Sequence, residues 1–210
     1  MFFPILTPTP VSPSEFIAYW HKQYDFGNED AYATVLSKDI LTEEDIRLLF
    51  LWKNNMGKVE KSMSGKKEVF LAKVNSRLEF LNELKRDFDL GRYISFFGDL
   101  SAIWGITLLH VTSSGKYPIY DQHVHRAYRY LTTGDSSEIS KYRPTIYRDY
   151  QDYYVPFFNS IRIDTPEFTE KQIDDALWAF GRFLSLYPDI LPEVGTVKLL
   201  VATFGDGTSR

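Results

Sequence analysis

The chain has 210 residues, of which 44% are hydrophobic, a formal net charge of -4 at pH 7 and no cysteine. Its length and hydrophobic content predict a globular protein with one large domain or two small ones. The lack of cysteine excludes disulfides, thiolate zinc sites, a cysteine nucleophile and a cysteine-ligated iron–sulfur cluster. The acidic balance weighs against strong non-specific DNA binding, which depends on Lys and Arg neutralising phosphates.

The N-terminal sequence gives no indication of export. The opening run MFFPILTPTPVSPSEF has no basic residue, and prolines interrupt it before an apolar stretch reaches signal-peptide length. No later stretch approaches the length of a membrane span. We therefore expect a cytoplasmic protein that does not enter a membrane.

Capping signals predict where the first helices begin. Ser12 can cap a helix that has Pro13 at its first position and Glu15 as the capping-box partner. Thr42 is a second candidate cap, and the acidic residues after it favour the positive end of a helix. Apolar residues then follow Thr42 at helical spacing, namely Ile46, Leu49 and Phe50.

The run KKEVFLAKVNSRLEFLNELKRDF, residues 66–88, continues this helical pattern. Its expected apolar stripe consists of Val69, Phe70, Val74, Leu78, Leu81 and Leu84. The wider segment from Lys58 to Arg86 has more basic than acidic residues, which we interpret as a solvated helix face.

The C-terminal third also predicts a helix. Thr169 and Gln172 form a capping box, and Pro188 follows where the helix should already have ended. The stripe of this helix consists of Ile173, Leu177, Phe180 and Leu184. A short strand is possible at residues 196–204, and residues 132–145 form the longest expected loop. The predicted fold class is all-α apart from that strand.

The middle of the chain predicts a helix, a turn, an apolar helix, a loop and a third helix. Gly98 and Asp99 supply the turn, and the apolar helix spans residues 103–111. Asp121 directly precedes the third helix, where its carboxylate can accept amides of the first turn and stabilise the helix by about 1 kcal/mol. Capping alone therefore explains an aspartate at this position.

A second explanation comes from the sequence PIYDQHVHR, residues 118–126. With the preceding turn and apolar helix, it resembles the helix-hairpin-helix DNA glycosylase superfamily (HhH-GPD) over residues 88–131. Residues 174–185 are similar to a late helix of that family, where a glycine allows close packing. The resemblance implies an all-α, two-lobed fold with a degenerate hairpin. One lobe would span residues 30–118, and the other would combine residues 1–29 and 119–210 across a cleft that holds Asp121.

The resemblance also implies roles for individual residues. Asp121 would be the catalytic carboxylate, because cleavage of a base–sugar bond develops positive charge that a fixed carboxylate can stabilise. The implied DNA-binding residues are Gly98, Leu100, Gln122, His123 and Arg126. Trp104 and Tyr120 would stack on a flipped base. Core packing is the alternative for both aromatic residues, and pairing with a carboxylate is the alternative for Arg126.

Two features depart from the family pattern. The hairpin reads FFGDLSAIWG, so only Gly98 matches the usual glycines, and Asp99 would place a negative charge where a phosphate should bind. The family's Schiff-base lysine would fall at Ile103 or Trp104, and neither can act as that nucleophile.

These observations predict a monofunctional DNA N-glycosylase, a hydrolase of the base excision repair type that lacks lyase activity. It would act as a monomer on lesion-containing double-stranded DNA and need no metal or other cofactor. One alternative is a non-catalytic descendant that binds nucleic acid or a protein. Another is an enzyme that cleaves the N-glycosidic bond of a nucleoside or nucleotide.

Overall fold

The structure is a computed structural model that describes residues 11–27, 29–54 and 66–187. The regular structure within these residues is helical, without a strand, in agreement with the all-α prediction. The possible strand at residues 196–204 lies outside the described residues. None of the described helices is long and apolar enough to cross a membrane.

The chain divides into two compact units. Unit 1 combines Met1–Tyr24 with Tyr120–Arg210, and unit 2 is the continuous segment Asp25–Ile119. The division predicted from the resemblance, residues 1–29 with 119–210 and residues 30–118, lies within a few residues of these boundaries. Asp121 belongs to unit 1, whereas the turn at Gly98 belongs to unit 2.

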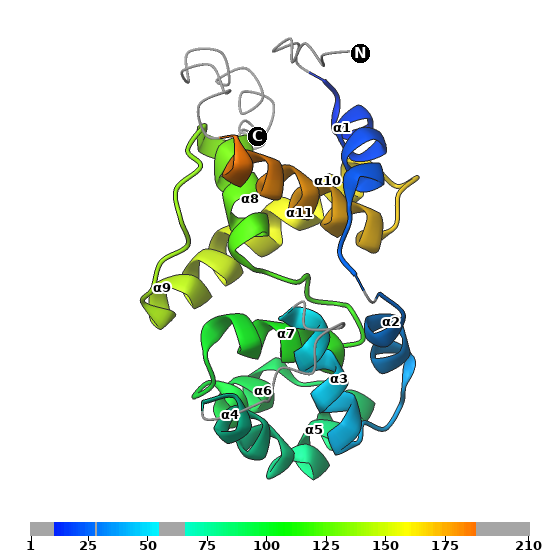
Figure 1. Cartoon of the computed structure of the whole chain (residues 1–210), viewed down its shortest axis with the longest axis vertical. Coiled ribbons are helices and arrows are strands. Elements are labelled where there is room, and N and C mark those ends of the chain that lie inside the picture. Colours follow the sequence, from blue (N-terminus) through cyan, green and yellow to red (C-terminus); the bar gives the residue numbers. More distant parts are fainter. Residues whose placement is uncertain (1–10, 28, 55–65, 188–210) are drawn as a thin grey trace, which may run out of the picture. The chain divides into compact units, whose positions relative to one another are not determined.

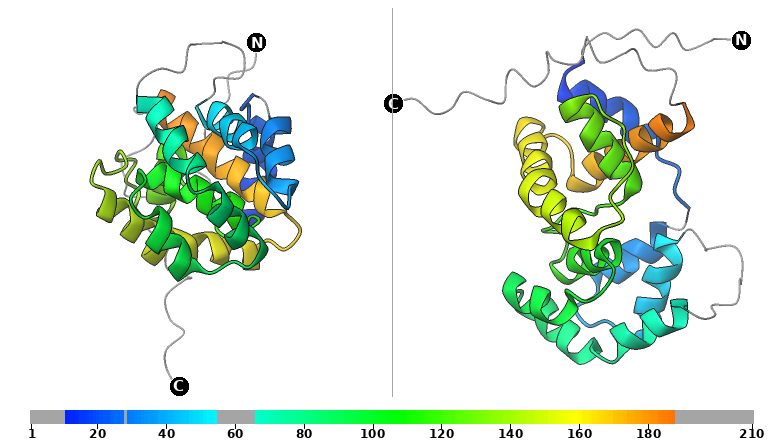
Figure 2. Two further views of the ribbon diagram at one scale, coloured as in Figure 1. Left: turned by 90° about the horizontal axis from the view of Figure 1, so that it is seen from below. Right: turned by 90° about the vertical axis from the view of Figure 1, so that its left-hand side faces the viewer.

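Unit 1 contains the blue helix α1 and the helices from α8 to α11, which run from light green to orange in Figure 1. Its helices are α1 (Pro13–Trp20), the 3-10 turn η1 (His21–Gln23), α8 (Gln122–Thr133), α9 (Arg143–Arg148), the π-helical turn η2 (Asp149–Tyr154), α10 (Val155–Asp164) and α11 (Glu170–Leu186). Helix α11 packs against α8, α1 and α10, so it forms the centre of the unit (Figure 2).

Helices α9, η2 and α10 form one uninterrupted helical run from Arg143 to Asp164. Within it the Val155 amide donates to the carbonyl of Tyr150, five residues earlier, which is the π-helical pattern. Pro156 follows directly and has no amide to donate. The wider turn therefore lies where the regular hydrogen-bond ladder would be broken in any case.

Unit 2 contains α2 (Glu29–Ser37), α3 (Glu43–Lys53), α4 (Lys66–Asn75), α5 (Leu78–Arg86), α6 (Leu90–Phe97) and α7 (Ala102–Thr112). Lys85 connects two of these helices, because its ammonium donates to the carbonyls of Leu36 at 3.2 Å and Val111 at 3.0 Å. These carbonyls lie near the ends of α2 and α7, where intrahelical donors are missing.

The predicted caps are confirmed. Ser12 and Glu15 form a reciprocal capping box at α1, as Thr169 and Gln172 do at α11. Thr42 caps α3, and the structure adds Asp45 as its capping-box partner.

The stripe predicted for residues 66–88 is wrong in one respect. The run is broken at Ser76 and Arg77, whose amides donate to the carbonyls of Ala72 and Val74. The second bond spans three residues instead of four and tightens the chain, so α5 starts in a new orientation. Leu81 and Leu84 are buried, as are Val74 and Leu71 of α4, but Val69 is 69% exposed.

Candidate functional site

Asp121 is the N-cap of α8, as the sequence predicted. Its backbone is extended, and the amides of His123 and Val124 donate to its Oδ1 atom at 2.9 and 3.1 Å. Both capping bonds are thus made by one of the two carboxylate oxygens. The side chain is half-buried, so the carboxylate is held in place without being enclosed.

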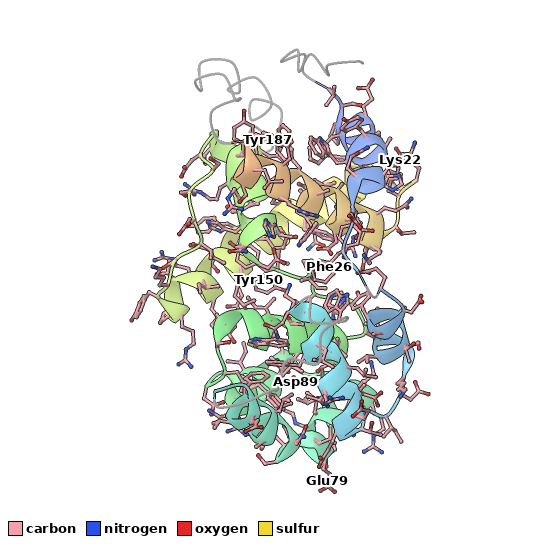
Figure 3. All side chains as sticks on the ribbon, viewed as in Figure 1. Lys22, Phe26, Glu79, Asp89, Tyr150 and Tyr187 are labelled. Carbon is pink, nitrogen blue, oxygen red and sulfur yellow. The ribbon has the colours of Figure 1, made fainter. Side chains whose placement is uncertain are left out.

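Tyr120, which precedes Asp121, is completely buried. A hydrogen bond of 2.6 Å joins its hydroxyl to Nδ1 of His125, and its ring lies 4.8 Å from the Tyr154 ring between centroids. Tyr150, labelled in Figure 3, also packs on the Tyr120 ring, with 5.6 Å between the two ring centroids. A ring with no exposed surface cannot stack on a base, so the predicted stacking role of Tyr120 is replaced by core packing.

Burial decides the protonation states of this pair. It lowers the pKa of His125 to about 4, so the imidazole is neutral at pH 7. Burial also raises the pKa of Tyr120 far above its ordinary value, so the phenol keeps its proton. The neutral imidazole of His125 and the protonated phenol of Tyr120 thus share a hydrogen bond without a net charge, and this bond anchors the first turn of α8 to the residue that precedes Asp121.

Tyr154 is a feature that sequence reasoning missed. It is completely buried, and within the described residues its hydroxyl has no hydrogen-bond partner. Burial raises the pKa of Tyr154 well above its ordinary value, and the negative charges of Asp174 and Asp121 add to this effect. An unbonded donor inside a protein is costly unless a water or ligand atom accepts from it. The signal in the sequence was the density of tyrosines in residues 142–158.

Arg126 and His123 are close together on α8. Arg126 is 8% exposed, and its Nη1 atom lies 3.3 Å from the Gly181 carbonyl and 3.4 Å from Nδ1 of His123. No carboxylate of the described residues forms an ion pair with it, so the predicted alternative of acid pairing is not observed there. The His123 ring packs against Trp178 at 5.1 Å, and Gln122 is exposed.

The turn in unit 2 does not have the arrangement of a phosphate-binding hairpin. The amide of Gly98 donates to the carbonyl of Ile94, and that of Leu100 donates to the carbonyl of Phe97. The Leu100 side chain is buried. Gly98 has a φ of -63°, which is ordinary helical geometry. Two amides expected to contact DNA are therefore already used within the turn.

Asp99 of this turn is neutralised by two cations. Arg77 binds it with two parallel bonds, Nη1 to Oδ1 at 2.7 Å and Nη2 to Oδ2 at 2.9 Å, and Lys73 Nζ lies 2.7 Å from Oδ2. These bonds hold the pKa of Asp99 well below its ordinary value. The negative charge expected at the hairpin is therefore present but compensated by part of the basic segment.

Trp104 packs in unit 2 as a partly exposed core residue. Its ring is stacked on Phe50, with 4.5 Å between centroids and 10° between planes, and lies 5.1 Å from Phe70. One face of the indole is therefore occupied. The structure thus brings Tyr120, Asp121, Gln122, His123 and Arg126 together in unit 1 and places Gly98, Leu100 and Trp104 in unit 2.

Comparisons with protein families, with curated proteins and with solved structures gave no match to this chain. Within the described residues no group of three or more His, Asp or Glu side chains could hold a metal ion. The polar side chains at the start of α8 are the Asp121 carboxylate, the His123 imidazole and the Arg126 guanidinium.

Proposed function

We propose that the protein is a monofunctional DNA N-glycosylase that removes a damaged or modified base, with Asp121 as the catalytic carboxylate. The observation that carries the proposal is the placement of this carboxylate, which is half-buried and held by two backbone amides at the N-terminus of α8. The partial positive charge of a helix N-terminus favours a negative group there.

The proposed reaction needs a carboxylate in a fixed position. Cleavage of the base–sugar bond develops oxocarbenium character on the deoxyribose, and Asp121 would stabilise that charge or orient the attacking water. Because the capping amides bind Oδ1, they hold the group rigid, which such stabilisation requires. Lyase chemistry is not proposed, since Ile103 and Trp104 cannot form a Schiff base.

Arg126 supports an anionic ligand near this carboxylate. A buried guanidinium without an acidic partner keeps its positive field. The anionic groups of DNA are its phosphates, and the geometry of a guanidinium suits them. Because the Arg126 side chain is buried, it would act on a bound phosphate mainly through its electrostatic field. Its bond to the Gly181 carbonyl holds the guanidinium in place. Contact between DNA and Gln122, which is exposed, is part of the same proposal.

One observation favours a second candidate, a non-catalytic protein that binds nucleic acid or a protein partner. Asp99 occupies Arg77 and Lys73, so the turn has little remaining positive charge with which to hold a phosphate. The amides of Gly98 and Leu100 are also bonded inside the turn. A descendant of a glycosylase that had lost its hairpin grip would have this arrangement.

The test is base release from a panel of lesion-bearing duplexes by the wild type, Asp121→Asn and Asp89→Asn. Asp89 is the matched control, because it caps α6 through its bond to the Arg92 amide but belongs to unit 2. The proposal expects release by the wild type and Asp89→Asn and a loss of at least about 100-fold with Asp121→Asn. Release that is unaffected by Asp121→Asn contradicts the catalytic role.

The same panel should include free nucleosides and an undamaged duplex. Release from nucleosides with none from duplexes would support the nucleoside alternative instead. Tight duplex binding without release from any substrate would support the non-catalytic protein.

A further inference from the structure

Unit 1 contains an apolar cavity of about 390 Å³ between α1, the end of α8 and α10. Its walls include Val11, Phe16, Ile17, Leu131, Phe157 and Ile161. A cavity of this size is large enough for a small ligand or for several apolar side chains. It plays no part in the reaction proposed above.

The two hydroxyl groups in the cavity wall are already used. Thr132 Oγ1 donates to the carbonyl of Tyr128, and Ser160 Oγ donates to the carbonyl of Phe157, each at 2.8 Å. The cavity therefore offers a ligand apolar surface, because both hydroxyl protons in its wall are already donated to backbone carbonyls. An occupant should be apolar and uncharged where it enters, because a buried unpaired charge is costly.

The position of Val11 indicates where such an occupant can come from. The described chain starts at Val11, which is 45% exposed and is itself part of the cavity wall. Val11 precedes the N-cap Ser12, and Phe16 is the fourth residue of α1. Apolar residues at these two positions commonly pack together and fix the direction in which the chain enters a helix. The preceding residues are thus tethered at the edge of the cavity.

The preceding sequence has the matching chemistry. Residues 1–10 read MFFPILTPTP, with five large apolar side chains within the first six positions and no charged side chain. The spacer Thr7–Pro10 contains two prolines, and an extended proline-rich chain covers about 3.1 Å per residue. A short tether gives an effective concentration in roughly the millimolar range, which no untethered partner of ordinary abundance reaches.

We propose that the cavity is the docking site for the chain's own N-terminal segment, with Phe2, Phe3, Ile5 and Leu6 as the inserted side chains. The segment covers the apolar surface between α1, α8 and α10, and an external acyl chain or apolar peptide has to displace it before binding. The inference is independent of the glycosylase proposal.

The first experiment measures access to the cavity with the dye 1-anilinonaphthalene-8-sulfonate. The variant Phe2→Ser/Phe3→Ser/Ile5→Ser/Leu6→Ser keeps the chain length and removes the apolar side chains. We expect it to bind the dye at least about tenfold more tightly than the wild type, because the tethered competitor is lost. Adding Ser160→Phe, which fills the cavity, should reverse that gain. Equal dye affinity in the wild type and the fourfold variant overturns the proposal.

The second experiment uses the absence of cysteine from the natural chain. The pair Ile5→Cys/Ser160→Cys should form an intramolecular disulfide under mild oxidation, detected by mass and by mobility without reductant. The control pair Ile5→Cys/Asp152→Cys should not, because Asp152 is exposed on η2 and is not part of the cavity wall. Equal oxidation of both pairs, or disulfide-linked dimers from the first, overturns the proposal. A third variant lacks residues 188–210. If this variant gains dye affinity and the fourfold serine variant does not, the proposal is overturned as well.

Discussion

Gly181 of α11 lies so close to α8 that a Cβ atom at this position would be 1.8 Å from the carbonyl oxygen of His123. That distance is far inside van der Waals contact, and the obstructing atom is backbone, which cannot turn aside. The two helices can therefore approach only because position 181 has no side chain. Since α8 carries Asp121 at its start, this contact also sets the position of the proposed catalytic group.

Substitution of Gly181 by alanine should destabilise the protein. The added methyl group forces α8 and α11 apart, and overpacking of this kind costs about 1–3 kcal/mol. Urea unfolding followed by circular dichroism measures the loss. Gly91→Ala is the matched control, because its Cβ would meet one side-chain oxygen, Asp89 Oδ1 at 3.3 Å, and no backbone atom of another helix. Alanine inside α6 should leave stability unchanged or raise it by up to about 1 kcal/mol. Equal stabilities of the two variants would contradict the close contact.

Variants of Asp121 should separate its structural role from its catalytic one. Asp121→Ala removes the acceptor of two amides and should lower the free energy of unfolding by about 1 kcal/mol. Asp121→Asn keeps a capping oxygen and should cost only a few tenths of that amount. Both variants should lose base release if the charge is catalytic. Denaturant unfolding and base release measured on the same preparations give the comparison. If base release falls only as far as the lower free energy of unfolding explains, capping α8 is the sole role of Asp121.

The stability of the protein should fall in mild acid because of His125. In the unfolded chain this histidine binds a proton near its ordinary pKa of about 6.5, whereas in the folded protein burial lowers the pKa to about 4. Between these values the unfolded state binds more protons, so acid favours unfolding. The contribution is fully present above pH 6.5 and is lost as the pH falls toward 4. After allowance for solvent screening we expect about 2 kcal/mol.

The measurement for His125 is the free energy of unfolding at several pH values for the wild type and His125→Gln. The substitution should lower stability at neutral pH and flatten the dependence between pH 6.5 and 4. Tyr120→Phe should keep a buried, neutral imidazole and therefore keep most of the slope. A slope in His125→Gln that equals the wild-type slope would show that other groups cause it.

Asp99→Asn should increase the affinity for DNA without a lesion. The change releases Arg77 and Lys73 from the carboxylate that now binds them, so both become available to phosphates. Each added phosphate contact steepens the dependence of log K on log salt by about 0.9. Fluorescence anisotropy with a duplex across a salt series measures this slope. Glu83→Gln, which frees Arg92 elsewhere in unit 2, is the control, and an equal effect of both changes would contradict a specific role of the turn.

The features that sequence predicted best are local. The caps at Ser12, Thr42, Thr169 and Asp121 follow from bonds that span two or three residues, so the sequence contains all the groups involved. The break at Ser76 and Arg77 could not be predicted in this way, because apolar residues on both sides fit a single stripe. Val69 is exposed for a local reason, because it lies two residues before the buried Leu71 and therefore on the opposite face of α4.

The features that sequence could not predict depend on distant segments. Tyr120 was expected beside a base, but its burial results from packing against Tyr150 and Tyr154, about thirty residues later in the numbering. The pairing of Asp99 with Arg77 likewise joins the turn after α6 to the break between α4 and α5. A pattern of residue types contains no information on which of these side chains meet.

The discontinuous make-up of unit 1 affects how the protein emerges during its synthesis. Unit 2 is one uninterrupted segment, so its helices can assemble as soon as residue 119 has left the ribosome. Helix α1 is made before it but packs against α11, which is translated near the end of the described chain. The apolar face of α1 therefore has no α11 to pack against while unit 2 is being synthesised. During this interval the exposed face can aggregate or bind a chaperone.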